Sequence, residues 1–436
     1  MTEPWHSCIS EELQQVESLM MRDLQSDNPE LTDMCLYVVG AGGKRLRPAV
    51  CILSYLACGG KDTDKPVRIG AGFEIIHSAT LVHDDINDQG EVRRGRKALH
   101  REYTTSKAII AGDFMFAMGF RLLAAAAPHI VDYIVDASAA MGAGEFIQKD
   151  FEHKTSVTED DYMLIIGDKT AKLFEASAKS GAAVSGADAE LVEAIGTFAH
   201  GIGMAFQIVD DTLDVIGDPK KTGKAVGTDL IEGKPTLPAI YAMKDPVVGP
   251  ELCGIFEKEY PLEEDVFRAL ELIQRTDAVE RCMAKAKEIS ESACSILDPF
   301  PDSVYRNALL DIAENVVNRQ RRGYGERRCF GGRVRSCGKH DGEIRRRERR
   351  FRALHREARP GRSAREMRRV HAVHGRDKGH VPQSRGCRAV VRHPRGSQMP
   401  GHQGDQAREP QEQDHPPRFR RIHHRQGPLR PVPGQE

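Results

Sequence analysis

The chain has 436 residues, a hydrophobic fraction of 40% and a formal net charge of −1 at pH 7. This length permits two or three average domains or one large helical domain. No stretch approaches the roughly 20 unbroken apolar residues that cross a bilayer, and the N-terminus lacks the basic and then apolar order of a signal peptide. We therefore expect a cytoplasmic protein without a transmembrane segment.

The ten cysteines are scattered along the chain and form no CxxC pair. Zinc sites and disulfide frameworks show regular cysteine spacing. The pattern therefore indicates reduced thiols and argues against both kinds of site.

The near-neutral net charge hides two segments of opposite charge. Residues 321–436 contain 29 Arg and 2 Lys against 12 Asp and Glu, a net of +19, which leaves residues 1–320 with a net of −20. The C-terminal segment is poor in aliphatic residues and cannot bury enough apolar surface to fold. We expect a tail of low order, which is either a frameshifted, out-of-frame translation or a disordered extension that binds nucleic acid or anionic membranes.

Residues 1–320 are dominated by helical patterns. Apolar residues recur at threes and fours in long segments such as GTFAHGIGMAFQIVDDTLDVI at 196–216, which is typical of helices. Clusters of Gly and Pro interrupt the pattern near 40–48, 58–66 and 217–238, and strand signals are nearly absent. We predict one all-α domain over residues 1–320, a bundle of ten or more helices that has no sequence sign of nucleic-acid binding.

An acidic pentad, DDIND at 84–88, ends the apolar run GAGFEIIHSATLVH. Residues four apart share one face of a helix, so the Asp84 and Asp88 carboxylates are expected about one turn apart. Like charges at that distance repel each other unless a cation lies between them. Mg²⁺ is the natural occupant, because it combines one or two carboxylates with waters and phosphate oxygens.

The same pattern recurs as DDTLD at 210–214, after the apolar run AFQIV. One such pentad alone is more often a solvated helix end than a metal site. Two copies embedded in apolar helices favour metal binding, because burying six carboxylates without counterions would be prohibitive. We predict that the two acidic pentads bind divalent cations.

Basic residues accompany both pentads. GGKRLRP at 42–48 places three bases in a turn that begins with glycines, and Arg93 and Arg94 follow the first pentad. Guanidinium forks and a flexible backbone suit diphosphate binding, although GGKRLRP in isolation would be a basic surface turn. After the second pentad, the loop 217–238 carries lysines at 220, 221, 224 and 234. These form either a mobile lid over phosphates or a solvated surface loop.

Seven motifs in this order resemble the all-trans polyprenyl diphosphate synthases, the family of farnesyl and geranylgeranyl diphosphate synthases. They are GGKRLRP, HDDINDQGEVRRG, AIIAGDFMF, GEFIQ, GDKTAKLF, FQIVDDTLD and GKAVGTDLIEGKPTLP. The similarity covers about residues 30–320. It implies the isoprenoid synthase fold, with helices around a central cavity. It also implies a prenyltransferase that condenses an allylic diphosphate with isopentenyl diphosphate into a longer all-trans polyprenyl diphosphate.

The resemblance further implies roles for individual residues. Isopentenyl diphosphate would be bound by Lys44, Arg47, His77 and Arg94. The allylic substrate, a dimethylallyl, geranyl or farnesyl diphosphate, would be surrounded by Arg93, Lys169, Thr170, Gln207, Lys224 and Lys234, of which Lys169, Thr170 and Gln207 also act in catalysis. The resemblance also implies that Asp84, Asp88, Asp210, Asp211 and Asp214 hold the three Mg²⁺ ions typical of such enzymes, and that these five carboxylates and Asp85 are catalytic. A homodimer is typical of such enzymes as well. His77 lies two helical turns from Asp84 on one stripe, which favours ligand binding over the role of a buried core histidine.

In this family an aromatic residue five or four places before the first aspartate limits the product to a short chain. Those places hold Ala79 and Thr80 here, and both are small. The resemblance therefore implies a product of geranylgeranyl length or longer, with Ile76 and Phe73 as deeper candidate floors of the pocket.

Two other functions share part of this pattern. A non-catalytic regulatory partner would keep the fold, but its pentads would usually be eroded, and both are intact here. A class I terpene cyclase would share one metal pentad but not the isopentenyl diphosphate site formed by GGKRLRP and His77.

Overall fold

The computed structural model describes residues 5–216 and 226–318, which all belong to one compact unit, Met1–Gly331. The tail expected over residues 321–436 lies outside the described residues, and so do Lys220, Lys221 and Lys224.

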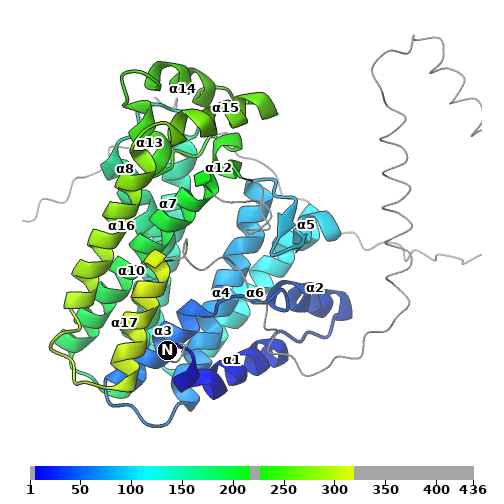
Figure 1. The fold of residues 1–436 in the computed structure, drawn as a ribbon. Coiled ribbons are helices and arrows are strands. Elements are labelled where there is room, and N and C mark those ends of the chain that lie inside the picture. Colours follow the sequence, from blue (N-terminus) through cyan, green and yellow to red (C-terminus); the bar gives the residue numbers. More distant parts are fainter. Residues whose placement is uncertain (1–4, 217–225, 319–436) are drawn as a thin grey trace, which may run out of the picture. The chain divides into compact units, whose positions relative to one another are not determined.

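The described residues form a bundle of helices, which confirms the predicted all-α class (Figure 1). The α-helices are α1 (Ser10–Asp23), α2 (Pro29–Val39), α3 (Leu46–Ala57), α4 (Asp64–Asn87), α5 (Leu99–Glu102), α6 (Thr105–Ala126), α7 (Val131–Phe151), α8 (Glu159–Ile166), α9 (Lys172–Ser185), α10 (Ala189–Ile216), α12 (Thr228–Ile231), α13 (Leu237–Met243), α14 (Gly249–Phe256), α15 (Glu263–Gln274), α16 (Ala278–Ser295) and α17 (Val304–Val317). Short helical turns are η1 (Ser7–Ile9), η2 (Pro128–Ile130) and the π-helical η3 (Gly167–Ala171). Within the described part, the strands are β1 (Val92–Arg93) and β2 (Arg96–Lys97), which pair antiparallel with Val92 opposite Lys97.

Local sequence signals begin several of these helices. The Asn28 side chain accepts a hydrogen bond from the Leu31 N–H at the start of α2, and Pro29 occupies the first helical position. Thr158 and Asp161 form a reciprocal capping box at the start of α8. Each cap satisfies backbone donors that a helix end otherwise leaves unpaired, and contributes about 1 kcal/mol.

α4 is a central helix and is buried along most of its length. Its residues are apolar on every side, and Ile69, Phe73 and Ile75 have no exposed surface, as expected of a helix inside a core. α6 lies close against it because Gly119 has no side chain. A Cβ atom at Gly119 would lie 2.5 Å from the Ile76 side chain.

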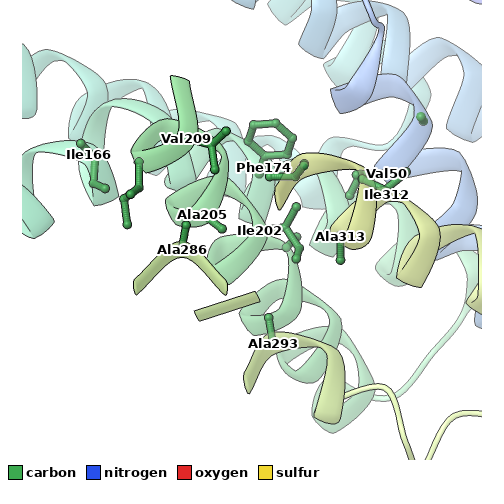
Figure 2. Close-up of a cluster of buried hydrophobic side chains, with 14 of the residues drawn as sticks. Val50, Ile166, Phe174, Ile202, Ala205, Val209, Ala286, Ala293, Ile312 and Ala313 are labelled. Atoms are coloured by element: carbon green, nitrogen blue, oxygen red, sulfur yellow. The ribbon is translucent and has the colours of Figure 1, made fainter. Parts of the chain in front are cut away.

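α10 is the second central helix, and it packs against α9, α16 and α17 (Figure 2). Its buried Ile202 and Val209 share one cluster with the fully buried Phe174 of α9. Replacing such a phenylalanine by alanine costs about 3–5 kcal/mol of folding free energy. Gly203 brings η3 against α10, because a Cβ atom there would lie 2.7 Å from the Cα atom of Ala171.

Among the described helices, α6 and α10 are long and apolar enough to cross a membrane by length and composition. Charged residues interrupt both helices, so neither helix is an unbroken apolar run. Core helices of globular proteins pass the same test, and 56% of the apolar window of α10 is buried in the fold. α6 is 39% buried by the same measure, and it leaves Ile109 and Ile110 exposed.

Candidate active site

The first pentad lies at the C-terminal end of α4, where Asp84 and Asp85 occupy the last turn and Asp88 is the C-cap. This end of a helix carries partial negative charge, so carboxylates there are disfavoured without cations. Burial, together with the charges of Glu145 and Asp88, raises the pKa of Asp84 to about 6, although Lys169 opposes the shift. A cation bound here would relieve this repulsion.

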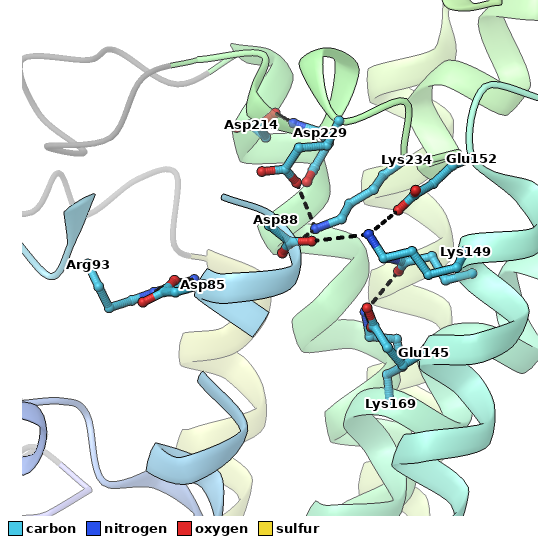
Figure 3. A network of polar contacts seen from close by, with 12 residues as sticks. Asp85, Asp88, Arg93, Glu145, Lys149, Glu152, Lys169, Asp214, Asp229 and Lys234 are labelled. Carbon is cyan, nitrogen blue, oxygen red and sulfur yellow. Dashed lines mark hydrogen bonds and ion pairs between the residues drawn. The ribbon is translucent and has the colours of Figure 1, made fainter. Parts of the chain in front are cut away.

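Asp85 points to a different neighbour. Its buried carboxylate accepts a 2.8 Å hydrogen bond from Nε of Arg93, at the end of β1 (Figure 3). The adjacent Arg94 donates a hydrogen bond to the carbonyl oxygen of Gly42. The β1–β2 hairpin is therefore fixed both to α4 and to the GGKRLRP turn, and Asp85 holds Arg93 in place.

Asp88 lies between two ammonium groups (Figure 3). Lys234 Nζ is 2.7 Å from Asp88 Oδ2, and Lys149 Nζ of α7 is 3.7 Å from Oδ1. Each lysine has a second carboxylate: Lys234 lies 2.7 Å from Glu232, and Lys149 lies 2.8 Å from Glu152. The predicted metal ligand Asp88 thus sits in an alternating network of acids and bases.

The second pentad lies near the C-terminal end of α10, and Asp211 in it is buried. The Tyr162 hydroxyl and the Gln207 amide each donate a 2.7 Å hydrogen bond to its carboxylate, and the Thr170 hydroxyl donates a 2.8 Å bond to Gln207 Oε1. Burial, with the charge of Asp229, raises the pKa of Asp211 to about 8 despite these bonds. The predicted residues Thr170, Gln207 and Asp211 therefore form one hydrogen-bonded chain.

Asp214 faces the short helix α12. Its Oδ2 accepts a 3.1 Å hydrogen bond from the Asp229 N–H, and burial and the charge of Asp214 raise the pKa of Asp229 to about 8. Burial alone would lower the pKa of Lys234, but the charges of Asp88, Glu232 and Asp229 outweigh burial and raise this pKa. Lys234 therefore interacts with carboxylates from both pentad regions, and this connects the ends of α4 and α10.

Lys169 lies in the π-helical turn η3, a type of turn that is frequent at functional sites. Its ammonium group forms an ion pair with Glu145 of α7 and donates a 3.0 Å hydrogen bond to Gln148 Oε1. The motifs GEFIQ and GDKTAKLF are therefore brought together by α7 and η3.

Arg47 lies in the first turn of α3, close enough to His77 of α4 for the two side chains to interact electrostatically. Arg47 is buried, its guanidinium carbon is 4.6 Å from the centre of the Phe174 ring, and its Nε donates no hydrogen bond to any described residue. Burial lowers the pKa of Arg47 to about 10. Burial and the charges of Arg47 and Arg94 hold the pKa of His77 well below its usual value. A buried guanidinium with an unused donor is suited to an anion.

Arg45 differs from its neighbours Lys44 and Arg47. Its side chain is buried and lies 2.9 Å from Glu74 Oε1, and it also donates a 2.9 Å hydrogen bond to the Val39 carbonyl. Its φ of 52° is left-handed. The three bases of the turn are therefore not equivalent, because Arg45 anchors the turn to α4.

The expected chain-length residues lie on α4. Ala79, Ile76 and Phe73 are fully buried, and the Thr80 hydroxyl donates a 2.8 Å hydrogen bond to the His77 carbonyl. Ile76 and Phe73 belong to a packed cluster to which α3, α4, α6, α7 and α9 contribute side chains. Lys224, expected at the allylic diphosphate, lies outside the described residues.

Several residues of this site were not identified from the sequence. They are Glu145, Lys149, Glu152, Tyr162, Asp229 and Glu232. Three of them lie inside sequence motifs that indicate the site. Glu145 belongs to GEFIQ, and Asp229 and Glu232 belong to the motif that contains Lys234. Nothing in the local pattern marked Tyr162, because it contacts Asp211 from 49 residues away.

The carboxylates suit a hard divalent cation. Oδ1 of Asp88 is buried and accepts no hydrogen bond from the described residues, and oxygen donors are the ligands that Mg²⁺ prefers. No group of three His, Cys, Asp or Glu side chains within residues 5–216 and 226–318 is already arranged around one point. The pentads would therefore hold Mg²⁺ together with waters and phosphate oxygens, as this ion usually binds.

Comparison with known proteins identifies relatives over the same region. A family model described as polyprenyl synthetase matches residues 28–273. The all-trans-nonaprenyl-diphosphate synthase (geranyl-diphosphate specific) of Rhodobacter capsulatus is 36% identical over 287 residues, which are 65% of this chain and 87% of the relative. The octaprenyl diphosphate synthase of Escherichia coli is 31% identical over 312 residues, 70% of this chain and 95% of the relative.

Solved structures agree with these matches. The polyprenyl synthase of Caulobacter crescentus, in complex with calcium and isoprenyl diphosphate, gives a TM-score of 0.68 at 31% identity and covers 72% of this chain and 96% of its own. The decaprenyl diphosphate synthase of Rhodobacter capsulatus gives 0.67 at 31% identity and covers 72% of this chain and 98% of its own. The expected isoprenoid synthase fold is confirmed.

Proposed function

The chain belongs to the polyprenyl synthetase family, and from this premise we propose how its site works. It is a polyprenyl diphosphate synthase, which condenses an allylic diphosphate with isopentenyl diphosphate into a longer all-trans polyprenyl diphosphate. The observation that supports our assignment of the site is Lys234, which pairs with Asp88 and interacts with Asp229 near the second pentad.

The family uses a divalent metal for diphosphate binding. In our proposal, three Mg²⁺ ions are held by Asp84 and Asp88 on one side and by Asp210 and Asp214 on the other. Asp211 completes the second cluster, and Tyr162 orients its carboxylate. Bound Mg²⁺ supplies Lewis-acid neutralisation of the charge that develops on the leaving diphosphate.

The basic residues divide between two diphosphates. Arg93, Lys169, Lys224 and Lys234 bind the allylic diphosphate. Lys44, Arg47, His77 and Arg94 bind isopentenyl diphosphate. Two observations support the assignment of Arg47 and His77 to isopentenyl diphosphate. The Nε donor of Arg47 is unused among the described residues, and Arg47 lies close enough to His77 to interact with it electrostatically.

The chemistry follows from this placement. The carbon–oxygen bond of the allylic substrate breaks, and the double bond of isopentenyl diphosphate attacks the allylic carbon. The Thr170 hydroxyl and Gln207 amide lie at the end of the Asp211 chain, and their dipoles stabilise the developing positive charge. The proton lost at the end of the step passes to the departing diphosphate.

The product is geranylgeranyl diphosphate or longer, in line with the heptaprenyl, octaprenyl and nonaprenyl synthases among the relatives. We assign the choice of length to α4, where Ala79 and Thr80 are the small side chains that precede the first pentad. The packed Phe73 and Ile76 at the α4–α6 contact then form the lower limit of the pocket.

The catalytic domain in this proposal spans residues 1–320, acts in the cytoplasm and pairs as a homodimer.

α6 and α7 leave large apolar side chains exposed, among them Ile110, Val135 and Phe146. An exposed apolar surface of this kind is typical of a subunit contact. Phe146→Glu should convert the dimer to a monomer in light-scattering chromatography, whereas an unchanged mass would contradict this assignment.

The function is tested with the purified full chain, Mg²⁺, radiolabelled isopentenyl diphosphate and a series of allylic primers. Asp84→Ala and Asp210→Ala should each lower kcat by about 10³-fold, whereas the exposed Asp132→Ala is the matched control. Turnover that survives both active-site changes would overturn the proposal. Diphosphate release without isopentenyl diphosphate would instead indicate a terpene cyclase.

A further inference from the structure

Lys149 belongs to the site by geometry, although none of the site motifs predicted a role for it. It lies in the last turns of α7, with Nζ 3.7 Å from Asp88 Oδ1 and 2.8 Å from Glu152 Oε1 (Figure 3). Lys234 occupies the other oxygen of the same carboxylate at 2.7 Å. Both oxygens of Asp88 therefore face an ammonium group.

The two lysines are held to different degrees. The Lys234 side chain is 14% exposed and is fixed by Asp88 and Glu232, both at 2.7 Å. The Lys149 side chain is 37% exposed and its contact with Asp88 is longer, at 3.7 Å. A lysine carries a compact charge on a flexible stem, so Lys149 is the one that can leave the carboxylate at little cost.

Lys149 and a divalent cation are competitors for the same oxygen. Two positive charges about 4 Å apart repel each other even near the surface, so a metal ion on Asp88 pushes Lys149 away from Oδ1. The displaced ammonium group can then form a charge-assisted hydrogen bond with an anionic oxygen of the ligand that binds with the metal.

We propose that Lys149 is a further diphosphate-binding residue of the active site and that it competes with divalent metal for Asp88 until a diphosphate binds. The inference rests on the proposed function of the pentads. Under this proposal metal and diphosphate bind cooperatively. The metal releases Lys149 from Asp88 for diphosphate binding, and diphosphate draws Lys149 away from the carboxylate that binds metal. Lys149 therefore weakens metal binding alone and strengthens diphosphate binding with metal.

The test uses the full chain with two probes, Mn²⁺ alone followed by electron paramagnetic resonance, and inorganic diphosphate in saturating Mg²⁺ followed by calorimetry. Lys149→Met should lower the dissociation constant for Mn²⁺ about fivefold and raise that for diphosphate about tenfold. Lys149→Arg keeps the charge and should resemble the parent protein in both. Lys154→Met, an exposed lysine five residues along the chain, is the matched control and should change neither constant.

A purely structural role of Lys149 would shift both constants in one direction. Unchanged constants, or changes of the same sign, in Lys149→Met overturn the inference. Asp88→Asn separates this failure from failure of the metal assignment: if it abolishes Mn²⁺ binding, the metal site stands on its own. If Asp88→Asn binds Mn²⁺ as the parent does, the metal assignment and the role of Lys149 both fall.

Discussion

The Tyr162 hydroxyl donates a 2.7 Å hydrogen bond to the Asp211 carboxylate, and both side chains are buried. A second donor to Asp211 is the Gln207 amide, which lies on the same helix one turn away. Tyr162 comes from α8, so this bond fixes the second pentad relative to a different helix. Without it, the carboxylate would be oriented by Gln207, which belongs to the same helix.

We predict that Tyr162→Phe lowers kcat about tenfold, since a hydrogen bond to a charged group contributes about 1.5–3 kcal/mol. This bond lowers the pKa of Asp211, so its removal should move the acidic limb of the pH–rate profile to higher pH. Tyr241→Phe is the control, because the Tyr241 hydroxyl bonds to Glu159 instead. A drop in kcat with no shift of the profile would contradict the role assigned to Tyr162.

The site carboxylates should make the protein less stable as the pH rises. The pKa values of Asp84 and Asp211 are raised from 3.8 to about 6 and about 8, so between about pH 4 and pH 8 the folded chain binds more protons than the unfolded chain. The contribution of these two carboxylates to stability therefore falls with increasing pH over this window. Asp84→Asn should raise the free energy of unfolding at pH 7.5 by about 1–3 kcal/mol.

Urea denaturation at pH 5 and pH 7.5, without added metal, measures this effect. The free energy of unfolding of Asp84→Asn, relative to the parent, should be higher at pH 7.5 than at pH 5. Asp132→Asn on the surface of α7 serves as the control. An Asp84→Asn variant that is less stable than the parent at pH 7.5 would show that the folded state favours the charged carboxylate.

The Arg45–Glu74 ion pair should be sensitive to the loss of one partner. Both side chains are buried, so Arg45→Met leaves a charged carboxylate without its partner and should cost about 3–5 kcal/mol. The double variant Arg45→Met/Glu74→Met removes both charges and should be less destabilised than either single variant. Arg68→Met removes an exposed partner of Asp64 and should cost less than about 1 kcal/mol.

Chemical denaturation of the parent, the two single variants, the double variant and Arg68→Met decides this prediction. A double variant as unstable as Arg45→Met would mean that packing or the hydrogen bond to Val39, and not the unpaired charge, dominates.

Ala79→Phe should shorten the product. The fully buried Ala79 lies on α4 between the first pentad and the packed Ile76, so an aromatic side chain there would block the path that we propose for the growing chain. Product chains analysed after phosphatase treatment should end at or near farnesyl length, whereas Ala79→Ser should leave the distribution unchanged. Products of equal length from the parent and Ala79→Phe would place the floor elsewhere.

The sequence alone predicted the helical class, the two pentads and most of the basic residues. This was possible because the relevant spacing is local: residues four apart share a helix face, and apolar residues recur with the period of a helix. It also marked Thr170 and Gln207, which the structure joins by a 2.8 Å hydrogen bond.

Tertiary packing decided how these residues pair. Neighbours such as Asp84 and Asp85 point about 100° apart on a helix, and only the packing of other elements shows that Asp85 faces Arg93 while Asp84 faces Lys169. Lys234 reaches Asp88 across 146 residues of chain from the segment between α12 and α13, and Lys149 reaches it from α7. Local periodicity specifies which face of its own helix a side chain occupies. The partner of that side chain depends on how separate helices pack, and the packing is set by side-chain volumes along the whole chain.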